Sequence, residues 1–212
     1  MSYPARTGYL DEQKVAEYER VRFSGLMGRY RYAREQAGVG AMVGRLPRDL
    51  EFLDVPCGNG RWWSLLEAHA TRITAIDVSP AMLRAAESRI ARTGVEVTVA
   101  EGDAEALPLE DGAVDVAFSH ALTKHLPVPV QGKVLAELAR VSRRWVVCSF
   151  SIFGPVTHQI WRRREFLDSH PLRPEQLDEL ASAAGLRVVA KKRCSTPIGV
   201  EHSVLLERSD PV

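Results

Sequence analysis

The chain contains little cysteine, no long apolar run and almost no net charge. Among its 212 residues are three cysteines, which are widely spaced and odd in number: Cys57, Cys148 and Cys194. This pattern argues against a disulfide framework and against a zinc cluster, and it makes a reducing cytoplasm the simplest compartment. Lys and Arg total 28 against 27 for Asp and Glu, so no overall field draws the protein to nucleic acid or to an anionic membrane.

Two further absences narrow the class of protein. No apolar run approaches the roughly 20 residues that a membrane-spanning helix needs, and residues 1–10 lack the apolar middle of a signal peptide. The six histidines show no metal-ligand spacing, because His120 and His125 would not share one face of a helix turn. We therefore expect a cytoplasmic protein, a monomer or a homodimer, with no bound metal and no transmembrane segment.

After residue 44 the sequence alternates between β-rich and helix-like segments, which favours a parallel sheet covered by helices. Strands are predicted at 51–55, 72–78, 95–102, 114–118, 145–150, 186–190 and 203–206, and helices at 81–92, 131–142 and 174–184. The connection 194–199 is too short for a crossover helix, so the last two strands should pair antiparallel at the sheet edge. The predicted fold is α/β, a Rossmann-like doubly wound sheet of seven strands, mostly parallel with an antiparallel C-terminal hairpin and with helices on both faces.

The predicted organisation is an N-terminal helical cap at 1–44 followed by one domain at 45–212. Residues 11–37 are helix-prone, and they either pack across the ligand end of the sheet or merely cover its edge. Within the domain, residues 152–173 are interpreted as an insertion that forms the acceptor site. This insertion combines aromatic residues with a basic cluster at 162–164, which suits an acceptor with a flat part and a negative charge, although a solvated basic helix face is the alternative.

The segment 53–60 is the most informative part of the chain. It runs from an apolar strand that ends at Asp54 into a turn with Gly58 and Gly60, and a helix follows, which is the unit on which nucleotide-like cofactors dock. A dinucleotide site favours a third glycine, but Trp63 occupies that position. The charge of Asp54 also suits a cationic group better than a diphosphate. The turn therefore favours a ligand with an ammonium or a sulfonium.

These features resemble the class I S-adenosylmethionine-dependent methyltransferases, of the small type 11 group. In that family the first strand ends in an acidic residue before a glycine-rich turn, as at 54–60, and the second strand ends in an acidic residue, as at Asp77. A Gly-Asp-Ala step follows the third strand, as at 102–104, and a Ser-His…His-Leu-Pro segment follows the fourth, as at 119–127. The resemblance extends from about Phe52 to Glu207. Pro56 departs from the usual glycine, and we expect it to stiffen the turn.

The resemblance implies that S-adenosylmethionine is the cofactor. Asp77 would accept hydrogen bonds from the ribose hydroxyls, Asp103 would accept one from the adenine amino group, and the glycine turn would face the methionine part. The whole implied cofactor-binding set is Asp54, Pro56, Gly58, Asn59, Gly60, Arg61, Asp77, Val78, Asp103, Ala104, Ser119 and His120. Arg22 and Arg61 are both candidates for pairing with the cofactor carboxylate.

His120 is the candidate general base, because an imidazole titrates near neutrality. A plain contact to the cofactor backbone is the alternative for this residue. The candidates for binding the acceptor are His125, Trp161 and Arg162. Cys57 is interpreted as a small packing residue, since methyl transfer from a sulfonium needs no covalent enzyme intermediate.

The expected function is transfer of a methyl group to an oxygen or nitrogen of a small-molecule, saccharide or lipid-intermediate acceptor. The reaction would be a direct displacement in which the protein mainly aligns the reactants. Three alternatives stay open at this point: a non-catalytic regulator that binds S-adenosylmethionine, a nucleic-acid methyltransferase and an NAD-dependent oxidoreductase.

Overall fold

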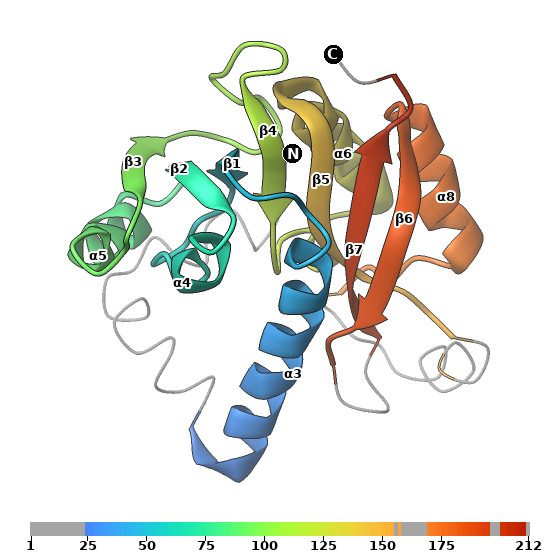
Figure 1. The fold of residues 1–212 in the computed structure, drawn as a ribbon. Helices are drawn as coiled ribbons and strands as arrows, with labels where there is room; N and C mark the ends of the chain where they lie inside the picture. The colour runs from blue at the N-terminus through green and yellow to red at the C-terminus, as the bar shows by residue number, and fades with distance from the viewer. Residues whose placement is uncertain (1–23, 155–156, 158–168, 196–199, 211–212) are drawn as a thin grey trace.

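A seven-stranded mixed sheet runs through the part of the chain that the computed structural model describes, which is residues 24–154, 157, 169–195 and 200–210 (Figure 1). The order of the strands across the sheet is β3-β2-β1-β4-β5-β7-β6. Their bounds are β1 Leu50–Asp54, β2 Ala70–Asp77, β3 Glu96–Glu101, β4 Val114–Ser119, β5 Ser142–Ser151, β6 Leu186–Arg193 and β7 Glu201–Arg208. The predicted seven-stranded Rossmann-like fold is confirmed.

The first five strands pair in parallel, and β7 pairs antiparallel with both β5 and β6. The antiparallel C-terminal pair is therefore confirmed, with one refinement: β7 lies inside the sheet and β6 forms its edge. The middle of β7 is buried on both sides, whereas β6 ends in the exposed Lys191, Lys192 and Arg193. Charged side chains suit an edge strand because they discourage pairing with another chain.

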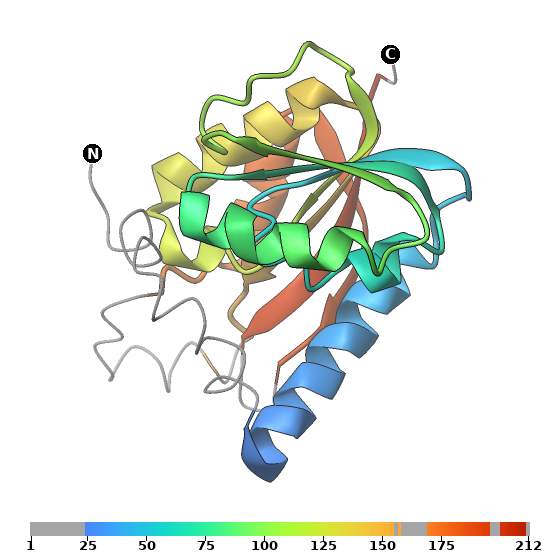
Figure 2. The same cartoon turned by 90° about the vertical axis from the view of Figure 1, so that its left-hand side faces the viewer.

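Helices cover both faces of the sheet (Figure 2). They are α3 Gly25–Val43, α4 Trp63–Leu66, α5 Pro80–Ile90, the 3-10 helix η1 Thr123–His125, α6 Val128–Val141 and α8 Pro174–Ala183. The predicted helix at 81–92 is confirmed as α5, which starts one residue earlier: Ser79 caps it by accepting a hydrogen bond from the Met82 N–H, and Pro80 occupies its first position. The helix after the glycine turn, α4, has only four residues.

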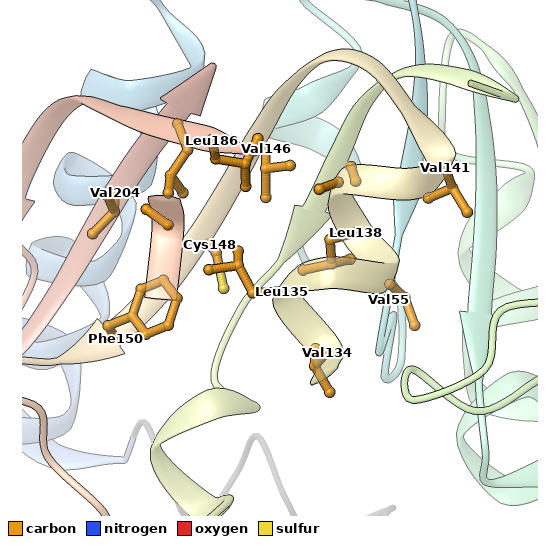
Figure 3. Close-up of a cluster of buried hydrophobic side chains, with 14 of the residues drawn as sticks. Val55, Val134, Leu135, Leu138, Val141, Val146, Cys148, Phe150, Leu186 and Val204 are labelled. Carbon is orange, nitrogen blue, oxygen red and sulfur yellow. The ribbon is translucent and has the colours of Figure 1, made fainter. Parts of the chain in front are cut away.

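Two buried clusters hold the layers together. On one face α6 and α8 pack against β1, β4, β5 and β7 through residues such as Leu135, Leu138 and Phe150, as Figure 3 shows. On the other face α3, α4 and α5 contribute residues such as Met42 and Trp63. The alternation of inward-facing residues along each strand sends one set to each cluster, as a sheet covered on both sides requires.

Helix α3 packs along the C-terminal strands, and its first turns extend past the end of β6 in Figure 1. A Cβ added at Gly38 would lie 2.4 Å from the Cβ of Cys194, so the helix backbone approaches β6 closely at that point. Of the helix-prone segment 11–37, the structure describes residues 24–37, and helix α3, which contains residues 25–37, packs against β6 and β7. Among the described residues, no helix is both long and apolar enough to cross a membrane.

Candidate functional site

The candidate site lies where β1, β2 and β4 end. The strand order reverses between β1 and β4, so the loops that follow these strands diverge and leave room at the carboxyl edge of the sheet. Asp54, Asp77 and Ser119 are the last residues of the three strands, and all are buried. The sequence places these residues far apart, and the parallel sheet brings them to one edge.

The glycine turn after β1 has the conformation that glycine allows. Gly58 and Gly60 have φ values of 54° and 75°, in the left-handed region. A Cβ added at Gly58 would meet no heavy atom within 4 Å, so the backbone borders open space there. A Cβ at Gly60 would lie 2.8 Å from the Trp63 ring. Gly58 therefore forms an open cradle, whereas Gly60 is required by the packing of Trp63.

Asp77 joins two loops of the site. Its Oδ2 accepts a hydrogen bond of 2.8 Å from the Gly58 N–H, and its Oδ1 accepts one of 2.9 Å from the Ser79 N–H. Burial raises the pKa of Asp77, and these backbone donors oppose the rise. A carboxylate has about four acceptor positions, so it can accept ligand hydroxyls in addition. The structure thus gives Asp77 a structural role that sequence reasoning did not find.

Asp54 is a fully buried carboxyl group with one satisfied oxygen. The indole N–H of Trp63 donates to Oδ2 at 3.0 Å, while Oδ1 has no hydrogen-bond partner within the described part of the chain. Burial raises the pKa of Asp54 to about 8; the nearby Asp77 charge adds to the rise, and the Trp63 bond and Arg61 oppose it. A buried acid beside an open glycine cradle suits a ligand that carries positive charge.

The loop after β3 lies next to this pair of acids. The Gly102 N–H donates to the Asp77 carbonyl at 3.1 Å, which brings residues 102–104 beside the end of β2. Asp103 Oδ1 accepts from the Glu105 N–H at 3.0 Å, so this side chain also shapes its own turn. Ala104 is half-buried, and Val78 is partly exposed on the loop after β2. The predicted adenine-side residues are therefore close to the predicted ribose-side residue.

Arg61 and His120 form a buried cluster on the other side of the glycine turn. Arg61 Nη1 lies 2.9 Å from Glu35 Oε2 on α3, and its guanidinium carbon lies 4.4 Å from the centre of the Trp62 ring. Arg61 Nη2 lies 3.4 Å from His120 Nδ1, and the imidazole is 4.6 Å from the Trp62 ring. Glu35 gave no signal in the sequence, because it is one charged residue in a helix-prone segment.

The predicted acceptor residues are only partly within the described structure. His125 is half-buried in η1, and Pro56 and Asn59 are half-buried in the glycine turn. Trp161, Arg162, Arg22 and the basic cluster 162–164 lie outside the described residues. The structure describes residues 152–154, 157 and 169–173 of the predicted insertion and residues 24–44 of the predicted cap.

A small basic cavity lies at the ends of β5 and β6, lined in part by the start of the predicted acceptor insertion and in part by residues of β6 and β7 that sequence reasoning missed. It has a volume of about 130 Å³, and its lining includes Phe153, Lys191, Arg193 and His202. The His202 ring donates from Nδ1 to the Val200 carbonyl at 2.8 Å, and burial lowers the pKa of this histidine. For the lining residues on β6, the only sequence signal was the basic run 191–193, which is equally typical of an exposed edge strand.

The cysteines are packing residues in this structure. All three are free and buried. Burial raises the pKa of the Cys57 thiol above its ordinary range, and the charges of Asp54 and Asp77 add to the effect, so the thiolate is disfavoured. No group of three or more His, Cys, Asp or Glu residues that could hold a metal ion occurs in the described part of the chain.

A family model described as a methyltransferase domain matches residues 52–144, which include the end of β1, all of β2, β3 and β4, and the loops that follow these strands. This chain carries a methyltransferase domain. The chain is 36% identical over 104 residues to a malonyl-[acyl-carrier protein] O-methyltransferase of Serratia marcescens, a match that covers 48% of this chain and 37% of the relative. It is 33% identical over 152 residues to 2-methyl-6-phytyl-1,4-hydroquinone methyltransferase 2, chloroplastic, of Oryza sativa subsp. japonica, covering 69% of this chain and 41% of that protein.

The curated relatives are longer proteins, and their matches to this chain span between 33% and 44% of their length. Among solved structures, magnesium protoporphyrin IX methyltransferase from Synechocystis PCC 6803 with bound SAH superposes with a TM-score of 0.76. That match covers 95% of this chain and 97% of the other at 17% sequence identity, so it shows the shared fold. The methyltransferase domain predicted from the four sequence motifs is confirmed over residues 52–144.

Proposed function

We propose that this protein binds S-adenosylmethionine and transfers its methyl group to an oxygen or nitrogen of a small-molecule, saccharide or lipid-intermediate acceptor. One observation carries the proposal most directly: the buried Asp54 carboxyl group, with one unpartnered oxygen, lies beside the open cradle at Gly58. Such a group is costly to ionise in the free protein, and a cationic ligand offsets that cost. The methyltransferase domain over residues 52–144 supports the same conclusion.

Each residue of the site has a proposed role. Asp77 accepts hydrogen bonds from the ribose hydroxyls while it holds Gly58 and Ser79, and Asp103 accepts one from the adenine amino group. Asp54 and the turn at 58–60 hold the cationic methionine end. When bound, S-adenosylmethionine supplies an electrophilic methyl group on a sulfonium sulfur. The residues around it contribute alignment and the exclusion of water, which can account for roughly 7–11 kcal/mol of a barrier.

Two observations narrow the proposed acceptor. The relative from Serratia marcescens is named an O-methyltransferase, which favours oxygen as the acceptor atom. The cavity lined by Lys191, Arg193 and His202 lies at the same carboxyl edge of the sheet as the cofactor residues, and its basic groups suit a negatively charged part of the acceptor. We propose residues 45–212 as the catalytic domain and residues 1–44 as an N-terminal helical cap.

The alternatives make different predictions for ligand binding. An NAD-dependent oxidoreductase would place a diphosphate at the glycine turn, where the indole of Trp63 occupies the third-glycine position and two buried acids stand nearby. A non-catalytic regulator would bind S-adenosylmethionine without turnover. A nucleic-acid methyltransferase is disfavoured by the net charge of +1.

Calorimetric titration followed by a transfer assay tests the proposal. The protein should bind S-adenosylmethionine and should show no saturable heat with NAD. Incubation with S-adenosylmethionine labelled on the methyl group and fractionated cell extract should then transfer label to an acceptor of low molecular mass. Binding without transfer to any fraction would favour the regulator, and label in the nucleic-acid fraction would favour the nucleic-acid enzyme.

A further inference from the structure

Glu35, Arg61 and His120 form a linked polar chain between the N-terminal helix and the end of β4. Glu35 lies on α3, Arg61 directly follows the glycine turn, and His120 directly follows β4. The distances are 2.9 Å between Glu35 Oε2 and Arg61 Nη1 and 3.4 Å between Arg61 Nη2 and His120 Nδ1. The chain therefore connects three segments that are separate in the sequence and that meet at the candidate site.

We propose that Glu35 is a positioning residue of this site, which acts through Arg61 to hold the His120 ring in the tautomer that carries its proton on Nε2. The catalytic consequence of this inference rests on the proposed function. The tautomer itself can be measured in the protein without a ligand. Nothing in the sequence motifs assigns a role to Glu35.

The contact with Arg61 restricts the tautomer of the His120 ring. A guanidinium has only N–H donors and stays charged in proteins, so it cannot accept a hydrogen bond from an imidazole. The contact between Arg61 and His120 Nδ1 is therefore made only when Nδ1 carries a lone pair. The His120 ring is then neutral, with its proton on Nε2. This nitrogen lies on the side of the ring away from Nδ1 and presents a donor.

The position of Arg61 depends on Glu35. The two side chains are each only 7% exposed, so their ion pair is buried, and removal of one partner leaves a charge without compensation. The face of Trp62 supports the guanidinium from one side. Helix α3 is itself fixed, because Val39, Met42 and Val43 are buried and Gly38 approaches Cys194. Glu35 is thus presented from a rigid element rather than from a mobile loop.

The tautomer decides between the two interpretations of His120. A ring whose proton is on Nε2 and whose Nδ1 accepts from Arg61 has no lone pair to offer to an acceptor hydroxyl. His120 then acts as a hydrogen-bond donor at the end of β4, and no proton passes to it during methyl transfer. The arrangement suits an acceptor oxygen that is already ionised, such as a carboxylate, since its attack on the sulfonium methyl forms the C–O bond, releases a neutral thioether and requires no base.

Nitrogen-15 NMR of the whole protein labelled at histidine tests the inference directly, because the two ring nitrogens have different shifts in the two tautomers. The His120 resonances are assigned by their loss in His120→Gln. The free protein should show a protonated Nε2 and an unprotonated Nδ1. Glu35→Ala should convert this single form to a mixture of tautomers, and Glu35→Gln, which keeps an oxygen for Arg61, should largely restore it. Arg143→Gln, which removes two ion pairs at the far end of the sheet, should leave the spectrum unchanged.

A double variant covers the case in which Glu35→Ala does not fold. Glu35→Gln combined with Arg61→Met removes both charges together, so no buried charge is stranded, and it should also lose the single tautomer. A protonated Nδ1 in the free wild-type protein, or an unchanged tautomer in Glu35→Ala or in the double variant, would overturn the inference. Calorimetry with S-adenosylmethionine is run on the same samples, so that loss of the proposed function is seen separately from loss of the tautomer.

Discussion

Acidic residues at the two ends of the sheet differ in burial and in ion pairing. At the amino ends of the strands, Glu51 and Asp115 share Arg143, with distances of 3.0 and 2.9 Å, and these side chains are partly exposed. At the carboxyl ends, Asp54 and Asp77 are buried, and among the described residues neither has an ion-pair partner within 4 Å. The first arrangement satisfies every charge with an opposite charge, whereas the second contains buried acids that no cationic side chain in the described part of the chain pairs with.

This difference separates stability from function. An arginine partner favours the ionised form of an acid, as the lowered pKa of Glu137, which accepts a hydrogen bond from Arg140, shows. The acids at the carboxyl ends instead have raised pKa values because they are buried. If these buried acids served stability alone, apolar residues in their place would give a higher free energy of unfolding. We therefore interpret the carboxyl end as the end built for a cationic ligand.

The largest expected effect is that of Asp77→Ala. Hydrogen bonds to a charged acceptor contribute about 1.5–3 kcal/mol each, so loss of two ribose contacts should weaken S-adenosylmethionine binding by about 10²-fold or more. Asp77 also accepts hydrogen bonds from the Gly58 and Ser79 N–H groups, so the free energy of unfolding should be about 1–3 kcal/mol lower in the variant. Calorimetry and chemical denaturation measure the two effects. Asp115→Asn is the control at the other end of the sheet, and equal affinities for Asp77→Ala and wild type would contradict the assignment.

Asp54→Asn should change how stability depends on pH. The pKa of Asp54 is raised from its ordinary value of 3.8 to about 8 in the folded protein, so its contribution to stability is present below pH 3.8 and is lost as pH rises toward 8. The loss should be at most about 1.4 kcal/mol per pH unit within that window. Denaturation of both proteins at pH 5, 6 and 7 should show the free energy of unfolding falling more steeply for wild type. Parallel curves would refute the raised pKa.

Trp63→Phe should have an intermediate effect. The variant keeps an aromatic ring near Gly60 but removes the indole N–H that donates to Asp54. A buried acceptor left without its donor costs about 1–3 kcal/mol, and the pKa of Asp54 should rise further because the Trp63 bond now lowers it. The test is denaturation of Trp63→Phe and of the double variant with Asp54→Asn. If the changes in the free energy of unfolding caused by Trp63→Phe and Asp54→Asn simply add in the double variant, the hydrogen bond contributes nothing to stability.

Arg143→Gln should have the smallest effect. The Arg143 side chain is 40% exposed, and exposed ion pairs contribute about 0–1 kcal/mol to stability. Its removal should leave affinity for S-adenosylmethionine unchanged, in contrast to the substitutions at the carboxyl end. A loss of affinity comparable to that of Asp77→Ala would show that the two ends of the sheet are not functionally distinct.

Sequence reasoning found the strands and the acids at their ends because both are local signals. Alternation and strand-end residues such as Asp54 and Asp77 can be identified within a short window of the sequence. Glu35 could not be found in this way, since its partner Arg61 lies 26 residues later and the contact depends on how α3 packs. The same limit applies to the cavity at Lys191, Arg193 and His202, because strand pairing brings its residues together.

The sequence position of Trp63 predicted only one of the two roles that we assign to this residue. Its position in place of a third glycine argued against a dinucleotide, which is a statement about sequence spacing. The structure adds that the indole donates to Asp54, so the same residue that excludes one cofactor also shapes the acid proposed to favour another. The position of β7 between β5 and β6 could not be predicted from the short connection that precedes it, because the pairing of β7 with β5 is a long-range contact.

The central claim is that a buried, protonated Asp54 gives up its proton to accommodate a cationic cofactor. Calorimetric titration of S-adenosylmethionine at pH 7, in two buffers with different ionisation enthalpies, measures the number of protons released on binding. The account predicts release of close to one proton for the wild-type protein, since Asp54 has a pKa of about 8, and almost none for Asp54→Asn. Absence of binding, or the same proton count for both proteins, would contradict it.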